Sequence, residues 1–204
     1  KIDQVMIKNM LSSKEVGYYA AAVKLSEAWY FIPMAICTSL FPAIIKAKQV
    51  SDKLYLSRLQ KLYDILAWMS IGIAIPVTFL SEFIIKILFG VKFLPAAPVL
   101  TIYIWAGVAT FLGVASSQYL ISENMTKLSF FRTLIGMIIN VILNLIFIPI
   151  YGIVGSALAT LISYTLATFS IGFSKKTSDQ ITMFLKSLIF LNFFLYVLKK
   201  IKLK

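Results

Sequence analysis

Long apolar runs constrain the fold of this chain more than any other feature of its sequence. Runs of about 20 apolar residues recur along most of its length, and a helix of that length crosses roughly 30 Å of hydrocarbon. Hydrophobic residues make up 60% of the chain and charged residues 14%, whereas about a quarter of a soluble domain is charged. The sequence therefore predicts an all-α, polytopic transmembrane helical bundle. The expected spans cover residues 16–45, 62–80, 96–121, 128–148 and 153–173.

The runs divide the chain into two regions. We expect residues 1–173 to form a transmembrane bundle of about five full spans, in which residues 1–11 are the end of a further helix. The chain begins with lysine rather than methionine, which indicates that upstream sequence is missing. Residues 174–204 are a basic tail whose last apolar segment, 183–198, is short for a span. We expect that segment to be an interfacial helix, and a sixth span is the alternative.

Basic residues are distributed unevenly among the loops. The loops after the first, third and fifth runs carry nine lysines and arginines, and the opposite loops carry four. Because cytoplasmic loops are rich in Lys and Arg, the first set is predicted to be cytoplasmic. This distribution also accounts for the net charge of +12, so the charge does not indicate nucleic-acid binding. The nine are Lys46, Lys48, Lys53, Arg58, Lys61, Lys127, Arg132, Lys175 and Lys176.

The residue types that carry enzyme chemistry are sparse. The chain has no histidine, so no imidazole base is present to activate a serine. Its single cysteine, Cys37, allows neither an intrachain disulfide nor a CxxC motif. The carboxylates are not spaced as metal ligands, and no phosphate-binding loop is present. We therefore predict a protein that is not an enzyme, with no catalytic residues, no metal site and no cofactor.

Two formal charges interrupt the first apolar run. In AAAVKLSEAWYFIP, residues 20–33, Lys24 and Glu27 lie three residues apart and can pair on one helix face. An ionised side chain near the centre of a bilayer costs about 3 kcal/mol even on lenient scales, so both must face protein or water. They are either a salt bridge that orients the helix or the charged lining of a hydrophilic cavity, and we favour the cavity. Pro33 is the expected site of a kink.

Further polar and aromatic residues are candidates for the same cavity. Asp3 lies beside a lysine at the end of the first, truncated helix, where it is either interfacial or part of the cavity lining. Asn140 and Asn144 share one helix face, where they either bond a neighbouring helix or line a polar path. The aromatic residues Trp29 and Tyr30 either pack in the core or stack on sugar rings.

Several segments resemble a known family. VGYYAAAVKLSEAWYFIP (16–33), FPAIIKA (41–47) and IPIYGIVGSALATLIS (148–163) are similar to the second half of bacterial polysaccharide flippases. These are the O-antigen and lipid-linked oligosaccharide translocases of the multidrug/oligosaccharidyl-lipid/polysaccharide exporter superfamily. KIDQVMI at the start and IWAGVATFLGVASSQYLISENMTKLSFFRT (104–133) extend the resemblance over most of residues 1–173.

The resemblance implies a MATE-like fold, in which two six-helix lobes surround a cavity that opens alternately to either side. This chain would be the C-terminal lobe of a flippase in the bacterial inner membrane. The implied cargo is an oligosaccharide repeat unit on undecaprenyl pyrophosphate, for O-antigen or lipopolysaccharide biosynthesis. Lys24 would then meet the pyrophosphate, and Glu27 or Asp3 would take part in ion coupling. The implied partners are membrane lipids, the missing N-terminal bundle, and polymerases and glycosyltransferases of the same pathway.

Three other functions are compatible with the sequence. A multidrug or cation antiporter of the same superfamily would line its cavity with carboxylates and apolar surface rather than lysine. A membrane enzyme of polysaccharide assembly would need a substantial extramembrane loop, whereas residues 46–61 form a short, basic linker. A scaffold subunit would direct its embedded charges only at other helices.

Overall fold

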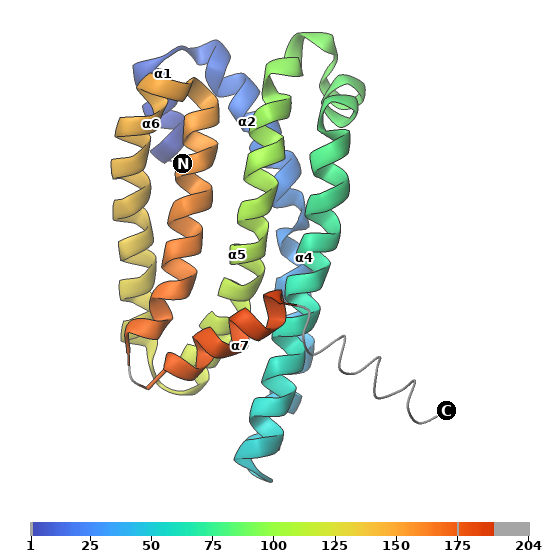
Figure 1. The fold of residues 1–204 in the computed structure, drawn as a ribbon, viewed down its shortest axis with the longest axis vertical. Coiled ribbons are helices and arrows are strands. Elements are labelled where there is room, and N and C mark those ends of the chain that lie inside the picture. The colour runs from blue at the N-terminus through green and yellow to red at the C-terminus, as the bar shows by residue number, and fades with distance from the viewer. Residues whose placement is uncertain (1, 175, 190–204) are drawn as a thin grey trace.

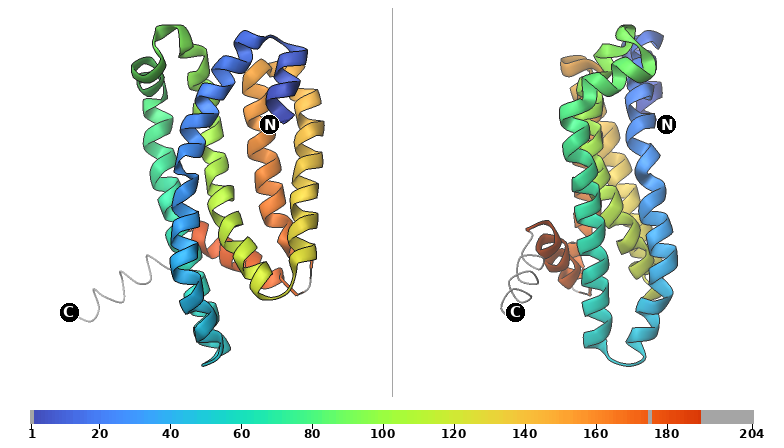
Figure 2. Two further views of the ribbon diagram at one scale, coloured as in Figure 1. Left: turned by 180° about the vertical axis from the view of Figure 1, so that it is seen from behind. Right: turned by 90° about the vertical axis from the view of Figure 1, so that its right-hand side faces the viewer.

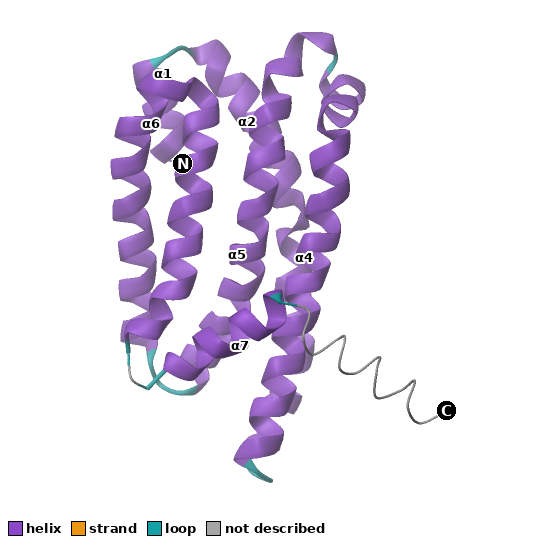
Figure 3. Cartoon of the chain, viewed as in Figure 1, coloured by secondary structure: helices purple, strands orange, loops and turns teal. Residues whose placement is uncertain are grey.

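The computed structural model describes residues 2–174 and 176–189, and every regular element in that part of the chain is a helix (Figure 3). The predicted all-α helical bundle is therefore confirmed. Four stretches of these residues are long and apolar enough to cross a membrane. They are Ser13–Lys48, Asp52–Phe89, Val91–Ser122 and Thr126–Phe173.

The chain opens with a short helix, α1 (Ile2–Met10), and a long broken rod made of α2 (Ser13–Glu27) and α3 (Phe31–Lys48). Figure 2 shows this rod in blue, running the length of the molecule. Ser12 caps α2, because its side chain accepts a hydrogen bond from the backbone N–H of Glu15. The sequence SSKE therefore begins a helix, as its pattern predicts.

A 3₁₀ turn, η1 (Ala28–Tyr30), separates α2 from α3. The irregularity lies one turn before Pro33, where we had expected the kink itself. Proline has no N–H for the carbonyl four residues earlier, and its ring crowds that carbonyl, so the distortion falls on the preceding turn around Trp29. Pro42 lies inside α3 without ending it.

The next two helices are α4 (Asp52–Phe89) and α5 (Ala97–Ser122), joined by the 3₁₀ turn η2 (Val91–Ala96). At 38 residues α4 is about 57 Å long, which exceeds the thickness of the hydrocarbon core. The first turns of α4 are therefore formed by residues 52–61 of the basic linker. At its other end α4 continues beyond the expected end at residue 80, as far as Phe89. Gly90, with φ of 82°, ends the helix.

The longest element, α6 (Thr126–Phe169), is a hairpin. Gly152 has φ of 60° and ψ of −140°, and the chain reverses there, so residues 126–151 and 153–169 lie side by side (Figures 1 and 2). The two arms correspond to the fourth and fifth predicted spans. The turn is tight, because a Cβ added to Gly155 would lie 2.2 Å from the carbonyl oxygen of Phe147.

The last described elements are η3 (Ser170–Phe173) and α7 (Ser178–Leu188). Figure 1 shows α7 in red, lying across the lower part of the bundle instead of along it. Part of the predicted 183–198 segment therefore packs on the bundle, and its residues 190–198 lie outside the described part of the chain.

The core is built around α5. In the most apolar segment of the α5 stretch, 61% of the residues are buried. In the corresponding segments of the other three candidate spans, 17–22% are buried. One apolar cluster joins α3, α4, α5 and α7, and a second joins α1, α2, α5 and α6. The remaining helices expose large apolar side chains, such as Phe79 at 84% exposure, as expected of helices that contact lipid.

Candidate functional site

A buried carboxylate lies at the α1 end of the bundle. Asp3 in the first turn of α1 is only 8% exposed. The hydroxyl of Tyr19 in α2 donates a hydrogen bond of 2.7 Å to Asp3 Oδ2, and the Tyr19 ring is fully buried. A charge-assisted bond of this kind stabilises an acceptor that has lost most of its water. The two helices are in contact, so the pair also ties α1 to α2.

The same polar contacts continue into both arms of α6. Tyr19 Oη lies 3.5 Å from Thr160 Oγ1. The amide nitrogen of Asn140 donates to Thr160 Oγ1 at 3.3 Å and to Ser163 Oγ at 3.2 Å, which links the two arms of the hairpin. Asn144, fully buried, donates to the side-chain and backbone oxygens of Asn140. We call these six residues the Asp3 cluster: Asp3, Tyr19, Asn140, Asn144, Thr160 and Ser163.

The Asp3 cluster is rich in oxygen atoms. Asn144 Oδ1 is buried and has no hydrogen-bond partner among the residues that the structure describes. An unpaired buried oxygen is costly, and it is available to a bound proton donor, water or hard cation. No group of three His, Cys, Asp or Glu side chains that could hold a metal ion occurs within residues 2–174 and 176–189. Any cation here would therefore depend on neutral oxygens beside the single carboxylate of Asp3.

Lys24 and Glu27 follow Tyr19 along α2, and the two side chains have different surroundings. Glu27 is partly buried, and its Oε1 accepts a hydrogen bond of 3.1 Å from Tyr103 on α5. The Tyr103 ring also meets Tyr19 edge-on, with centroids 6.1 Å apart. Tyr103 thus connects Glu27 to the Asp3 cluster. Lys24, by contrast, is exposed on the outward face of α2.

The two candidate aromatic residues, Trp29 and Tyr30, differ in their exposure to solvent. Trp29 is 39% exposed, whereas Tyr30 is partly buried and its ring lies beside Gly107 of α5. Both side chains border a small pocket between η1, α4 and α5, which Ser26 and Ser70 also line. The pocket is mostly apolar. Tyr30 therefore has the surroundings of a packing residue, and Trp29 keeps a free surface.

The structure thus brings Asp3, Asn140 and Asn144 together, and it keeps Lys24 and Trp29 on the surface. Sequence reasoning missed four hydroxyl partners: Tyr19, Tyr103, Thr160 and Ser163. Thr160 and Ser163 could have been recognised, because they are hydroxyl residues three positions apart within an apolar run. Tyr19 and Tyr103 carried none, because a tyrosine in a membrane helix is equally compatible with apolar packing.

A further embedded charge was not recognised as buried. We counted Arg132 among the loop residues, although the expected span 128–148 includes it, and it lies within α6 and is 7% exposed. Its guanidinium donates to Ser116, to Ser117 Oγ at 2.6 Å and to the carbonyl oxygen of Gly113 at 3.2 Å, all on α5. In the described part of the chain, no carboxylate lies within ion-pair distance of Arg132. Its charge is satisfied by hydroxyls and a helix carbonyl.

The fold and its embedded polar groups define the class of this protein. It is a polytopic α-helical membrane protein whose helices enclose a carboxylate, amides and hydroxyls in a bundle that is otherwise apolar. Comparison with known sequences shows which proteins the chain resembles. The family described as polysaccharide biosynthesis protein matches residues 1–98.

Three relatives extend the match over most of the chain. A probable low-salt glycan biosynthesis flippase of Haloferax volcanii is 28% identical over 171 residues, which are 82% of this chain and 36% of that protein. A probable flippase of the same organism is 26% identical and covers the same two shares. An uncharacterized membrane protein of Methanocaldococcus jannaschii is 30% identical over 185 residues, 84% of this chain and 40% of that protein.

The chain spans less than half the length of these relatives. No solved structure gives a significant match. The chain is therefore similar to polysaccharide-flippase-type membrane proteins, as the sequence resemblance indicated. The relatives whose names state an activity are flippases, which are transporters and not enzymes.

Proposed function

We propose that this chain is the C-terminal lobe of a flippase that moves undecaprenyl-pyrophosphate-linked oligosaccharide repeat units across the bacterial inner membrane. The repeat units serve the biosynthesis of an O-antigen-like polysaccharide. A second lobe with the same MATE-like architecture completes a central cavity, which opens alternately to either side of the membrane. The polar headgroup passes through this cavity while the lipid tail stays in the bilayer.

The observation that carries the proposal is the position of Lys24. It is exposed, yet it lies inside the candidate span Ser13–Lys48, about 16 Å along the helix from Ser13. An ammonium group at that depth is not stable against lipid, so the outward face of α2 must meet water or other protein. A cavity wall satisfies this requirement, and an exposed lysine there attracts a pyrophosphate.

Neighbouring residues suit an amphipathic cargo. Trp29 presents a half-exposed indole just over one turn beyond Lys24, and aromatic faces stack on sugar rings. Glu27 is held by Tyr103 and is positioned to accept hydroxyl protons of a sugar. The partners in this proposal are membrane lipids, the N-terminal lobe, and the polymerase and glycosyltransferases of the pathway.

The Asp3 cluster supports coupling to an ion. Its buried carboxylate and neutral oxygens suit a proton or a hard monovalent cation, whose binding would change the packing of α1 against α6. The same feature favours a second candidate function, a multidrug or cation antiporter. The flippase and the antiporter differ in cargo, so an assay of polysaccharide export separates them.

The proposal predicts that Lys24→Glu abolishes export of the polysaccharide. The substitution places a negative charge where the pyrophosphate passes, so like charges repel. Export is measured as surface polysaccharide in cells that lack the native flippase, with membrane abundance of each variant measured by immunoblot. Lys92→Glu is the matched control, because Lys92 is exposed and lies at the end of its helical stretch.

Normal export by Lys24→Glu at normal abundance would remove Lys24 from the mechanism. Lost export in both variants would point to bulk charge instead of the cavity. Drug resistance without any polysaccharide export by the wild-type protein would favour the antiporter.

A further inference from the structure

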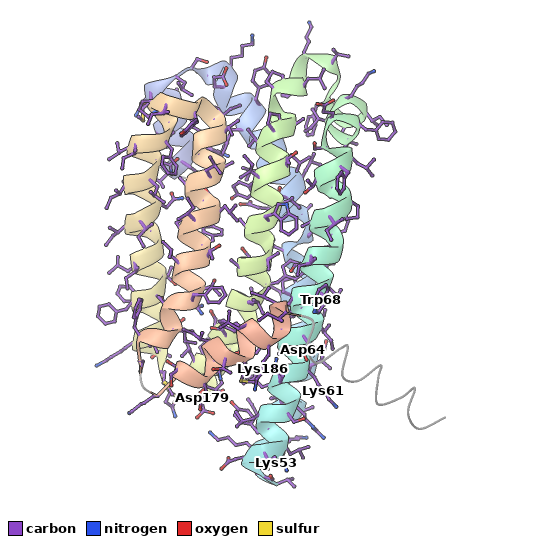
Figure 4. The ribbon with its side chains drawn as sticks, in the orientation of Figure 1. Lys53, Lys61, Asp64, Trp68, Asp179 and Lys186 are labelled. Carbon is purple, nitrogen blue, oxygen red and sulfur yellow. The ribbon has the colours of Figure 1, made fainter. Side chains whose placement is uncertain are left out.

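The helix α7 is fixed to α4 by buried polar contacts. Its inward stripe consists of Gln180, Met183, Phe184 and Ser187. Ser187 Oγ accepts from Gln60 Nε2 and donates to Asp64 Oδ1, both at 2.8 Å. The indole nitrogen of Trp68 donates to the carbonyl oxygen of Ser187 at 2.9 Å. These contacts hold the C-terminal end of α7 against one level of α4, as Figure 4 shows for Asp64 and Trp68.

The outward stripe of α7 is amphipathic. Leu185 and Ile189 are 45% and 63% exposed, and Lys186 is exposed between them. On α4, Lys61 and Ile65 are exposed one turn apart beside the same contact. Lys61 directly follows Gln60 and Lys186 directly precedes Ser187, so the two lysines flank a hydrogen-bonded pair. Figure 4 places both labelled lysines at this junction.

The junction lies where α4 changes from polar to apolar. Residues 52–61 carry most of the charges of α4, and the apolar part of the helix follows. Trp68 is partly exposed just inside this boundary, the level at which tryptophan is enriched in membrane proteins. The phosphate groups of a bilayer lie at this level. The basic residues concentrated at this end of the bundle indicate the cytoplasmic leaflet.

The acidic groups nearby offset the two lysines only in part. The Asp64 carboxylate accepts hydrogen bonds from Gln60 and Ser187 and keeps its negative charge, so Lys61, Lys186 and Asp64 together leave one net positive charge at the junction. Asp179 is at the opposite end of α7, about two turns from Lys186, where it complements the helix dipole. Figure 4 shows Lys53 far out along α4.

We propose that the junction of α4 and α7 binds the headgroup of an anionic phospholipid of the cytoplasmic leaflet. Lys61 and Lys186 contact the lipid phosphate, and Leu185, Ile189 and Ile65 contact its acyl chains. This combination of exposed apolar and cationic side chains on a helix lying across the bundle fits a lipid surface better than a soluble protein. The site is separate from Lys24 and does not depend on the transported cargo.

The test measures lipid binding to the full chain in neutral detergent. Bound phosphatidylglycerol and phosphatidylcholine are counted by native mass spectrometry, and each lipid is titrated. The wild type should bind phosphatidylglycerol more tightly than phosphatidylcholine. The double variant Lys61→Gln/Lys186→Gln should bind phosphatidylglycerol about 25-fold more weakly, because each lysine near an anionic surface contributes about a factor of five.

The matched control is Lys8→Gln/Lys92→Gln, which removes two exposed charges from the opposite end and should leave binding unchanged. Lys61→Arg/Lys186→Arg should retain binding. Equal losses in the Gln variant and the control would overturn the proposal, and so would unchanged affinity in the Gln variant. Displacement of the lipid by inorganic phosphate at equal concentration would indicate a small-anion site instead and would also overturn it.

A second measurement keeps both lysines. In a Trp29→Phe/Trp105→Phe background, Trp68 is the remaining tryptophan of the chain's three. Brominated phosphatidylglycerol should quench its fluorescence more strongly than brominated phosphatidylcholine. Equal quenching by the two lipids would contradict the proposal even if a lysine variant failed to fold.

Discussion

Asp3 and Arg132 are each held by partners on another helix, and Asn140 by partners on the other arm of α6. Asn144 donates within its own arm, and its Oδ1 has no partner among the described residues. Asp3, Asn140 and Asn144 stand out in the sequence, because a polar residue in an apolar run needs a partner. Their partners could not be predicted, since Tyr19 and Thr160 are brought together by packing between residues 141 positions apart. The sequence therefore indicates that these three residues need partners, and the fold decides which partners they contact.

Replacing Tyr19 by Phe should destabilise the bundle. The change keeps the ring and removes the hydroxyl that donates to Asp3 and approaches Thr160, which leaves a buried carboxylate without this donor. Loss of such a bond costs about 1–3 kcal/mol. We expect a lower thermal midpoint in detergent, measured by the loss of helical circular dichroism.

The neighbouring Tyr18→Phe variant serves as the control. Tyr18 is also buried, but its described contacts are ring contacts, with Phe93 edge-on and with the Lys14 ammonium. Its midpoint should stay close to that of the wild type. A Tyr19→Phe midpoint equal to that of Tyr18→Phe would show that the Asp3 bond contributes little.

Arg132 shows how a charge can mislead sequence analysis. A lone arginine shortly after a loop is typical of the loop itself, but here hydroxyls of α5 accept its donors inside the bundle. We expect Arg132→Lys to lower stability by about 1.5–3 kcal/mol, because an ammonium cannot reproduce the planar fork of donors. Denaturation of the purified protein in SDS measures the change.

Arg58→Lys provides the comparison for Arg132→Lys. Arg58 is exposed and donates to the carbonyl oxygen of Ala43, so its replacement should change stability by less than about 0.5 kcal/mol. Equal effects of the two substitutions would mean that the contacts of Arg132 with α5 are weak.

At the scale of elements, apolar runs predict the spans well and their ends poorly. The five expected spans all correspond to helix, because each run must satisfy its backbone within itself in a membrane. The extension of α4 through the basic linker was less visible, since a polar helix outside the membrane has no apolar pattern. The docking of α7 on α4 depends on Gln60 and Ser187, which are distant in sequence.

The hairpin α6 has a glycine, Gly155, at a position where no side chain would fit. We expect Gly155→Ala to destabilise the protein by about 1–3 kcal/mol, because the new Cβ would overlap the Phe147 carbonyl oxygen and force the turn to open. Gly72→Ala in α4 meets nothing within 4 Å, so it should be neutral or stabilising by up to about 1 kcal/mol. Thermal midpoints of the two variants, measured side by side, should move in opposite directions or differ clearly. Similar midpoints would contradict the close approach of the two arms.

At the scale of the whole molecule, the exposed surface of the helices is of two kinds. Most of it is apolar, as at Leu145 on the first arm of α6, which is 56% exposed. The outward face of α2 is different, because it carries the exposed Lys24 within a candidate span. Under the proposed function the apolar face contacts lipid and the α2 face contacts a water-filled cavity.

Thiol labelling distinguishes these two faces. The chain contains one cysteine, the buried Cys37, so Cys37→Ser provides a background without thiols. In the full-length protein in membranes, Lys24→Cys should react readily with a water-soluble maleimide, because only a hydrated thiol ionises to the reactive thiolate. Leu145→Cys should stay largely unlabelled, although its side chain is also exposed in the isolated bundle, because lipid would cover it. Comparable labelling of both positions, or of neither, would mean that α2 does not line an aqueous cavity, and it would remove the main support for a cavity at Lys24.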